Sequence, residues 1–241
     1  MDMSWLFNSP IAHRGLWDLN NPENSLGAYQ KAIDGGYNIE IDVHLLPDGD
    51  FAVFHDGNLK RVCGENIKIN SLKGHELHEH KLLNKNGETT DFYIPTLKEV
   101  LDLVGGKVGL LIEMKDFSNK HGACEKLYKQ LKDYSGNYAI QSFGGSALAW
   151  WRKNTKDVPI GILSFAGGNI MLPCWKHTVK PDFHAFDIKG LPDCYVMHRQ
   201  KKGVMVLSWT IRTEELFEKC KKVGVDNVIF ENIRPREYRK S

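Results

Sequence analysis

Apolar residues follow two rhythms along the chain. Continuous or alternating apolar runs predict strands, and apolar residues that recur every three or four positions predict helices between them. Strands are expected at 10–12, 37–45, 51–55, 108–114, 138–142, 159–164, 183–188, 204–208 and 225–230. Helices are expected at 25–34, from Thr96 onward, and at 120–134, 145–153, 193–202 and 213–223, whereas 167–180 fits neither rhythm. The alternation predicts an α/β fold around a parallel sheet.

The predicted strands are one too many for an eight-stranded (β/α) barrel, and the turn at 47–50 accounts for the surplus. A connection this short cannot hold a crossover helix, so the two strands that flank it must run antiparallel. The second barrel strand then continues into a hairpin, which sets His55 roughly opposite Asp42. The remaining eight strands close a TIM barrel, whose usual length is close to the 241 residues of this chain.

Residues 57–95 lack a regular strand–helix pattern and are too long for a simple loop. Short alternations of charged and apolar residues occur there, with apolar side chains that need a packing partner. We therefore predict one domain over residues 1–241, with a small inserted cap at about 57–95 after the second strand, near the barrel mouth.

Composition excludes several classes of protein. Apolar residues make up 41% of the chain and charged residues 26%, which is an ordinary globular balance, and the formal net charge of +2 gives no reason to expect a nucleic-acid partner. The short basic tail at 234–240 is interpreted as a solvated chain end, the alternative being a contact with a membrane surface or a polyanion.

The sequence also predicts the compartment. The five cysteines include no Cys-x-x-Cys pair, which is typical of reduced, scattered thiols in a cytoplasmic protein. Residues 1–10 do not have the pattern of a signal peptide, and no uncharged apolar stretch of about 18 residues predicts an integral membrane segment.

Three carboxylates fall near the ends of predicted strands. Glu40 and Asp42 are two positions apart, so both side chains face the same side of their strand, and Glu113 ends another strand. Barrel enzymes build their active sites at the carboxyl ends of strands. Carboxylate oxygens without cysteine favour Ca²⁺ or Mg²⁺ over zinc. One divalent cation is therefore predicted, against the alternative of a polar strand face or a structural salt bridge.

Two imidazoles and two cations accompany these acids. His13 and His55 each end a predicted strand, which makes them candidates for proton transfer, although an isolated histidine is more often a satisfied core residue. Arg14 offers a planar donor fork that suits a phosphodiester, and Lys115 is expected to contact a phosphate oxygen, unless it only pairs with Glu113. The other histidines, such as those in the insertion, are interpreted as surface residues.

Two further positions are candidates for substrate binding. Glu23 comes just before a predicted helix, where its segment 22–25 serves as a helix start, but its carboxylate is also predicted to reach the metal or a substrate hydroxyl. Trp209 follows a strand at the mouth and is predicted to form a wall of the ligand pocket. The pair Trp150-Trp151, by contrast, is predicted to pack in the core.

The ordered set of these motifs resembles the glycerophosphodiester phosphodiesterase family over nearly the whole chain. No single motif is specific, but their order is. The matching segments are His13–Gly15, Pro22–Ser25, Glu40–Val43, Asp48-Gly49, His55-Asp56, Pro95–Leu97, Ile112–Lys115, Ser142-Phe143 and Trp209-Thr210.

The resemblance implies a TIM barrel with a small insertion and hydrolysis of glycerophosphodiesters to sn-glycerol 3-phosphate and an alcohol. The paired catalytic histidines of the family match His13 and His55, and its phosphate-contacting basic residues match Arg14 and Lys115. Its divalent-cation ligands match Glu40, Asp42 and Glu113. The chain departs from the family at 211–212 and at 230–232, which puts the shape of the alcohol pocket in doubt.

Several readings stay open at this point. One histidine is expected to take a proton while the other gives one to the leaving alcohol, through a cyclic glycerophosphate or by direct attack of water. The rival functions are a lysophospholipase D-like activity and a noncatalytic phosphate-binding barrel. The insertion is expected to shape the leaving-alcohol pocket without supplying catalytic groups.

Overall fold

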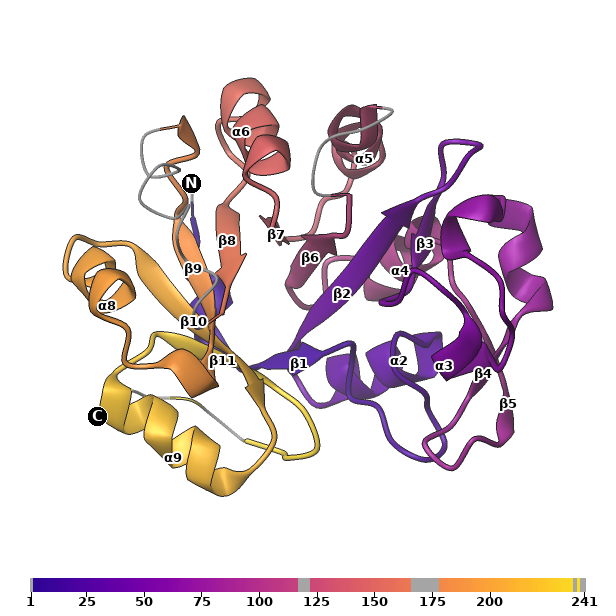
Figure 1. Cartoon of the computed structure of the whole chain (residues 1–241), viewed down its shortest axis with the longest axis horizontal. Coiled ribbons are helices and arrows are strands. Elements are labelled where there is room, and N and C mark those ends of the chain that lie inside the picture. The colour runs from indigo at the N-terminus through magenta and orange to yellow at the C-terminus, as the bar shows by residue number, and fades with distance from the viewer. Residues whose placement is uncertain (1, 117–121, 166–177, 236–237, 239–241) are drawn as a thin grey trace.

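The computed structural model describes residues 2–116, 122–165, 178–235 and 238, and its centre is a closed parallel barrel (Figure 1). Each strand pairs with the next around the ring, and the last pairs with the first. In ring order the strands are β1 (Ile11–His13), β2 (Asn38–Leu45), β6 (Leu110–Met114), β7 (Tyr138–Ser142), β8 (Ile160–Ser164), β9 (Phe183–Asp187), β10 (Met205–Ile211) and β11 (Asn227–Phe230). The predicted eight-stranded TIM barrel is confirmed.

Helices cover the outside of this barrel, close to the predicted positions. They are α2 (Leu26–Asp34), α4 (Leu97–Val104), α5 (Ala123–Leu131), α6 (Gly145–Asn154), α8 (Cys194–Gln200) and α9 (Glu214–Val223), with a short 3₁₀ turn, η5 (Ile188–Gly190), after β9. Thr96 and Glu99 form the predicted capping box at the start of α4. The outward residues of β2 (Ile39, Ile41 and Val43) are buried in the layer between strands and helices, which leaves its acidic residues on the inner face.

The surplus strand forms the predicted hairpin. Strand β3 (Phe51–Val53) runs antiparallel to β2, with Val43 opposite Val53. The backbone N–H of Phe54 donates to the carbonyl oxygen of Asp42 over 3.0 Å. Asp42 is thus opposite Phe54, one residue from the predicted partner, and His55 follows immediately beside the barrel mouth.

The insertion is a small folded unit whose internal structure was not predicted. It contains α3 (Lys60–Cys63), two 3₁₀ helices, η1 (Ile69–Ser71) and η2 (Gly74–Glu79), and an antiparallel pair, β4 (Lys81–Leu83) and β5 (Thr89–Tyr93). Figure 1 shows α3, β4 and β5 together on one side of the barrel, next to α2. Apolar side chains of the insertion form a separate core with Leu46, Ala52 and Phe54 of the hairpin.

The bottom of the barrel is closed by a short helix that the sequence did not predict, α1 (Trp5–Asn8). Trp5 and Leu6 pack against the apolar side chains that fill the barrel interior. Asn38 Nδ2 donates to the carbonyl oxygen of Trp5 over 2.7 Å, and Asn227 Nδ2 donates to that of Leu6 over 2.6 Å. The interior is therefore a packed core below and a polar site above.

Several smaller predictions concern other parts of the chain. None of the four cysteines in the described part of the chain forms a disulfide bond, and Cys174 falls outside it. Most of 167–180 and most of the basic tail also fall outside the described residues. Among the helices that are described, none has the length and apolar character needed to cross a membrane.

Candidate active site

The strand register brings the three predicted acidic residues together at the barrel mouth. Asp42 of β2 pairs with Glu113 of β6, and Glu40 of β2 pairs with His13 of β1. Glu40, Asp42 and Glu113 are all buried, and one oxygen from each lies within 4.8 Å of the others. The i, i+2 spacing read from the sequence therefore does place one acidic cluster inside the barrel.

Two cations lie against the acidic cluster. Lys115 Nζ is 2.6 Å from Glu113 Oε1 and 2.9 Å from Asp42 Oδ1. Burial raises the pKa of Glu40 well above its usual range and that of Glu113 to about 7. Burial also opposes ionisation of Asp42, but Lys115 and Arg14 together keep the pKa of this carboxyl well below its usual range.

The acidic cluster fits a hard divalent cation. Asp42 Oδ1 is fully buried and accepts no hydrogen bond of suitable geometry from the described residues, although Lys115 is nearby. Three carboxylates crowded in a buried site repel one another unless positive charge joins them. Oxygen-only donors of this kind are the ligands that Ca²⁺ and Mg²⁺ take in proteins.

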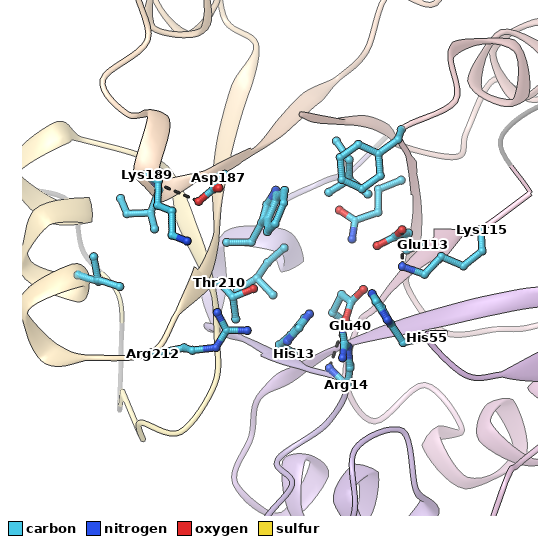
Figure 2. A pocket seen from close by; sticks show the side chains of 17 residues that line it. His13, Arg14, Glu40, His55, Glu113, Lys115, Asp187, Lys189, Thr210 and Arg212 are labelled. Carbon is cyan, nitrogen blue, oxygen red and sulfur yellow. Dashed lines mark hydrogen bonds and ion pairs between the residues drawn. The ribbon is translucent and has the colours of Figure 1, made fainter. Parts of the chain in front are cut away.

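His13 and His55 lie on either side of Glu40 at the cavity (Figure 2). Each is held by a carboxylate through the same ring nitrogen. His13 Nδ1 lies 2.8 Å from Glu231 Oε2, and His55 Nδ1 lies 2.6 Å from Asp56 Oδ1. A carboxylate on Nδ1 fixes the tautomer that carries its proton there, which leaves Nε2 to exchange protons with a ligand. The structure thus brings both predicted histidines to one cavity.

Arg14 adopts a left-handed backbone conformation at the turn after β1, with φ of 57°. Its backbone N–H donates to Glu40 Oε2 over 3.2 Å, and its Nε lies 3.3 Å from Asp42 Oδ2. A left-handed conformation is uncommon for a residue other than glycine, and it persists where surrounding contacts enforce it. The turn therefore aims both the backbone and the guanidinium of Arg14 at the acidic cluster.

Gly15, which follows, has φ of 83°, and an added Cβ would lie 2.9 Å from the Cβ of Ala28 in α2. The close approach that requires glycine here is thus to a helix of the barrel.

Glu23 lies behind Arg14, away from the pocket wall. It accepts a hydrogen bond from Arg14 Nη1 over 2.8 Å and is also bound by Arg61. It is absent from the described residues that line the cavity, and both of its oxygens accept from arginine donors. Its contact with a metal or a substrate hydroxyl stays a prediction.

The cavity has a volume of about 530 Å³, and its lining includes Glu40 and Glu113 of the acidic cluster and the aromatic side chains of Phe143 and Trp209. The ring of Trp209 lies 6.0 Å from that of Phe143, and Trp209 Nε1 donates to the carbonyl oxygen of Ala185. Trp209 therefore forms the predicted wall. Figure 2 shows Asp187, Lys189 and Arg212 across the cavity from Lys115.

The insertion is not part of this cavity. Of the described residues that line it, none comes from 57–95. The expectation that the insertion shapes the pocket is therefore wrong for the part of the chain that the structure describes. Its apolar side chains instead pack in its own core, against the β2–β3 hairpin.

Comparison with known proteins decides the family. The glycerophosphoryl diester phosphodiesterase family matches residues 13–234, from the first histidine of the site to beyond β11. A glycerophosphodiester phosphodiesterase of Caldanaerobacter subterraneus subsp. tengcongensis is 34% identical over 232 residues, which cover 91% of this chain and 92% of that protein. The chain belongs to the glycerophosphoryl diester phosphodiesterase family. As a member, it is an enzyme that hydrolyses glycerophosphodiesters to glycerol 3-phosphate and an alcohol.

The chain is also similar to a second curated protein and to a solved structure. A lysophospholipase D of Rattus norvegicus is 37% identical over 261 residues, covering 91% of this chain and 82% of that protein. A solved phosphodiesterase of Oleispira antarctica has the same fold, with a TM-score of 0.82, 24% identity and 93% coverage of both chains.

Asn24, Tyr29 and Glu231 hold residues of this phosphodiesterase site, a role that the sequence reasoning did not assign to them. Asn24 Nδ2 donates to Asp42 Oδ2 over 3.1 Å, and Tyr29 donates its hydroxyl to Asn24 Oδ1 over 2.8 Å. Glu231, which holds His13, also accepts from Arg212 Nε over 3.0 Å. Side chains alternate between the two faces of a strand, so Glu231, four positions after Asn227, lies on the same inner face. This alternation could have been used to predict the position of Glu231 from the sequence.

Other aromatic and histidine predictions had mixed outcomes. Trp151 is fully buried, as predicted for the core. The interpretation of the remaining histidines as surface residues is wrong for His80 and His184, which are buried. It is also wrong for His44, which is partly buried and donates from Nε2 to the carbonyl oxygen of His55 over 3.1 Å.

Proposed function

We propose that His13 and His55 are the general acid–base pair of the hydrolysis. The observation that carries the proposal is that two imidazoles, each held through Nδ1 by a carboxylate, flank one buried acidic cluster in the same cavity. The substrate is a small glycerophosphodiester, since the cavity admits a small molecule, and the near-neutral charge of the chain favours no nucleic-acid partner.

In this mechanism one histidine takes the proton of a glycerol hydroxyl as its oxygen attacks phosphorus. The other histidine gives a proton to the leaving alcohol as the P–O bond breaks, which forms a cyclic glycerophosphate. Water then opens the ring with the two proton transfers reversed. Arg14 and Lys115 contact non-bridging phosphate oxygens, and both already point at the acidic cluster. Direct attack of water on phosphorus requires the same residues.

Glu40, Asp42 and Glu113 are proposed to hold one divalent cation, Ca²⁺ or Mg²⁺. A bound cation of this kind supplies Lewis-acid stabilisation of negative charge on the phosphate. Asn24 fixes the Asp42 carboxylate for this task by donating to its Oδ2, and Tyr29 fixes Asn24 in turn. A cytoplasmic location is also proposed, because the described cysteines form no disulfide bond.

Glu231 is proposed to orient His13. Burial lowers the pKa of His13, and the hydrogen bond to Glu231 opposes this by raising it. For Glu231→Gln we therefore expect a further decrease in the pKa of His13, measured by NMR titration. We also expect at least about a tenfold decrease in kcat, since the carboxylate of an acyl-transfer triad contributes more than that.

Glu218→Gln is the matched control for this prediction, because Glu218 forms an ion pair with Lys221 on the exposed face of α9. An unchanged kcat in Glu231→Gln, with Glu218→Gln also unchanged, would contradict the orienting role.

Hydrolysis of lysophospholipids is the second candidate, favoured by the aromatic wall. The ring of Phe143 contacts Trp209 and, at 6.0 Å, the 48% exposed Phe165, so apolar surface continues outward from the cavity. The similarity to a mammalian lysophospholipase D supports the same activity. Against it, Asp187, Lys189 and Arg212 are charged groups whose burial by an acyl chain is costly.

A substrate panel decides between the two candidates. We expect kcat/KM for glycerophosphocholine to exceed that for lysophosphatidylcholine by at least about tenfold, because an acyl chain that desolvates even one charged group loses more than 1.4 kcal/mol. The assay uses both substrates with Ca²⁺ and with Mg²⁺, and a chelator provides the blank. Equal or faster cleavage of lysophosphatidylcholine would make the second candidate the function.

A further inference from the structure

Arg61 is the one described residue of the insertion that binds the carboxylates behind the site, and it binds two of them. It lies in α3, at the second position of that helix. Its guanidinium donates to Asp56 from Nε over 2.7 Å and from Nη2 over 3.1 Å. It donates to Glu23 from Nη1 and Nη2, both over 2.7 Å. Both carboxylates are thus held by the paired donors that make arginine–carboxylate contacts strong and directional.

Each of these carboxylates also holds a residue of the site. Asp56 accepts from Nδ1 of His55, and Glu23 accepts from Nη1 of Arg14. Neither Asp56 nor Glu23 is among the described residues that line the cavity. Arg61 is therefore linked to His55 through the carboxylate of Asp56, and to the phosphate-binding Arg14 through the carboxylate of Glu23.

We propose that Arg61 is a positioning residue for the hydrolysis, holding His55 through Asp56 and Arg14 through Glu23. The proposal rests on the catalytic and binding roles proposed above for His55 and Arg14. It gives the insertion a function that needs no contact with substrate. Because Arg61 holds both His55 and Arg14, both turnover and substrate affinity depend on it.

Charge explains why an arginine is needed between these carboxylates. Glu23 is largely buried, and without Arg61 its one remaining cationic partner among the described residues would be Arg14, which also faces Asp42. Arg14 would then be drawn toward Glu23, because a partly buried carboxylate that loses a donor keeps its desolvation cost. Asp56 would likewise be free to rotate away from His55. A lysine is a single point charge and cannot supply paired donors to both carboxylates.

The experiment compares Arg61→Gln and Arg61→Lys with the parent protein. Kinetics with glycerophosphocholine at saturating divalent cation give kcat and KM. Separately, ¹⁵N-histidine spectra of the cation-free protein report whether Nδ1 of His55 carries the proton, the signal being assigned by its loss in His55→Ala. Arg152→Gln is the matched control, since Arg152 also binds an aspartate, Asp182, but stands away from the cavity.

We expect Arg61→Gln to lower kcat by at least about tenfold, as loss of an outer-shell partner does elsewhere, and to raise KM. The His55 signal should shift toward a mixture of tautomers. Arg61→Lys should recover part of kcat, and Arg152→Gln should lower only the thermal midpoint. Should Arg61→Gln not fold, Arg61→Lys carries the test, with an expected kcat below that of the parent.

The proposal is overturned if a folded Arg61 variant keeps the kcat, KM and His55 signal of the parent. It is also overturned if Arg152→Gln lowers kcat as much as Arg61→Gln does, since the effect is then general destabilisation. A parent protein that hydrolyses no glycerophosphodiester contradicts the proposed function instead. The His55 signal still decides the positioning role in that case, because it does not depend on activity.

Discussion

Each of the substitutions His13→Ala and His55→Ala is expected to lower kcat for glycerophosphocholine by at least about a hundredfold, the lower range of general acid–base contributions. One imidazole acts on the attacking hydroxyl and the other on the leaving alcohol, so neither can replace the other. Each has its own carboxylate on Nδ1, which makes the two arrangements independent.

Cation binding should survive both histidine substitutions, because the acidic cluster contains neither imidazole. Isothermal titration with Ca²⁺ or Mg²⁺, alongside steady-state kinetics, checks the two expectations together. His78→Ala is the matched control, as His78 is an exposed histidine that also pairs with a carboxylate, Glu99. A histidine whose removal leaves turnover near normal has no part in proton transfer.

Asp42→Ala should lower cation affinity by at least about tenfold and turnover by at least about a hundredfold, since a metal in such a site stabilises transition-state charge by several kcal/mol. Asp42 is at the centre of the cluster: it faces Lys115, Arg14 and Asn24 and pairs across the sheet with Glu113. Its removal also leaves two cations without their common partner.

Titration of the cation and steady-state kinetics test this expectation on the same preparation. The matched control is Asp182→Ala, which removes an aspartate from a salt bridge with Arg152 at the other end of β9. If Asp42→Ala binds cation as tightly as the parent while its activity falls, Asp42 is not a ligand, and its role is to hold Lys115 and Arg14.

The barrel was predictable because each strand carries its own local signal. The apolar runs, the short turn at 47–50 and the spacing of Glu40 and Asp42 each depend on residues near one another in the sequence. Barrel closure then follows from the number of strands. The acidic cluster was predictable for the same reason, because period-two alternation fixes which side chains face inward.

The missing parts depend on contacts between distant segments. Glu231 and His13 are 218 positions apart, and their pairing requires the closure of β11 onto β1. The contact of Glu23 with Arg61 could not be predicted, because Arg61 comes from the insertion. Helix α1 is too short for a periodic signal, and the strands β4 and β5 are stabilised mainly by the core beneath them.

Strand β3, which leads into the insertion, lies beside the segment by which the chain leaves it. The backbone N–H of Val53 donates to the carbonyl oxygen of Pro95 over 2.9 Å, and Ala52 forms a bridge with Thr96. A segment whose ends are neighbours can be lengthened, shortened or exchanged during evolution without moving the strands that carry it. Descendants of this barrel are therefore free to remodel the insertion, within one inherited constraint: whatever replaces it has to return a guanidinium to the place where Arg61 now stands.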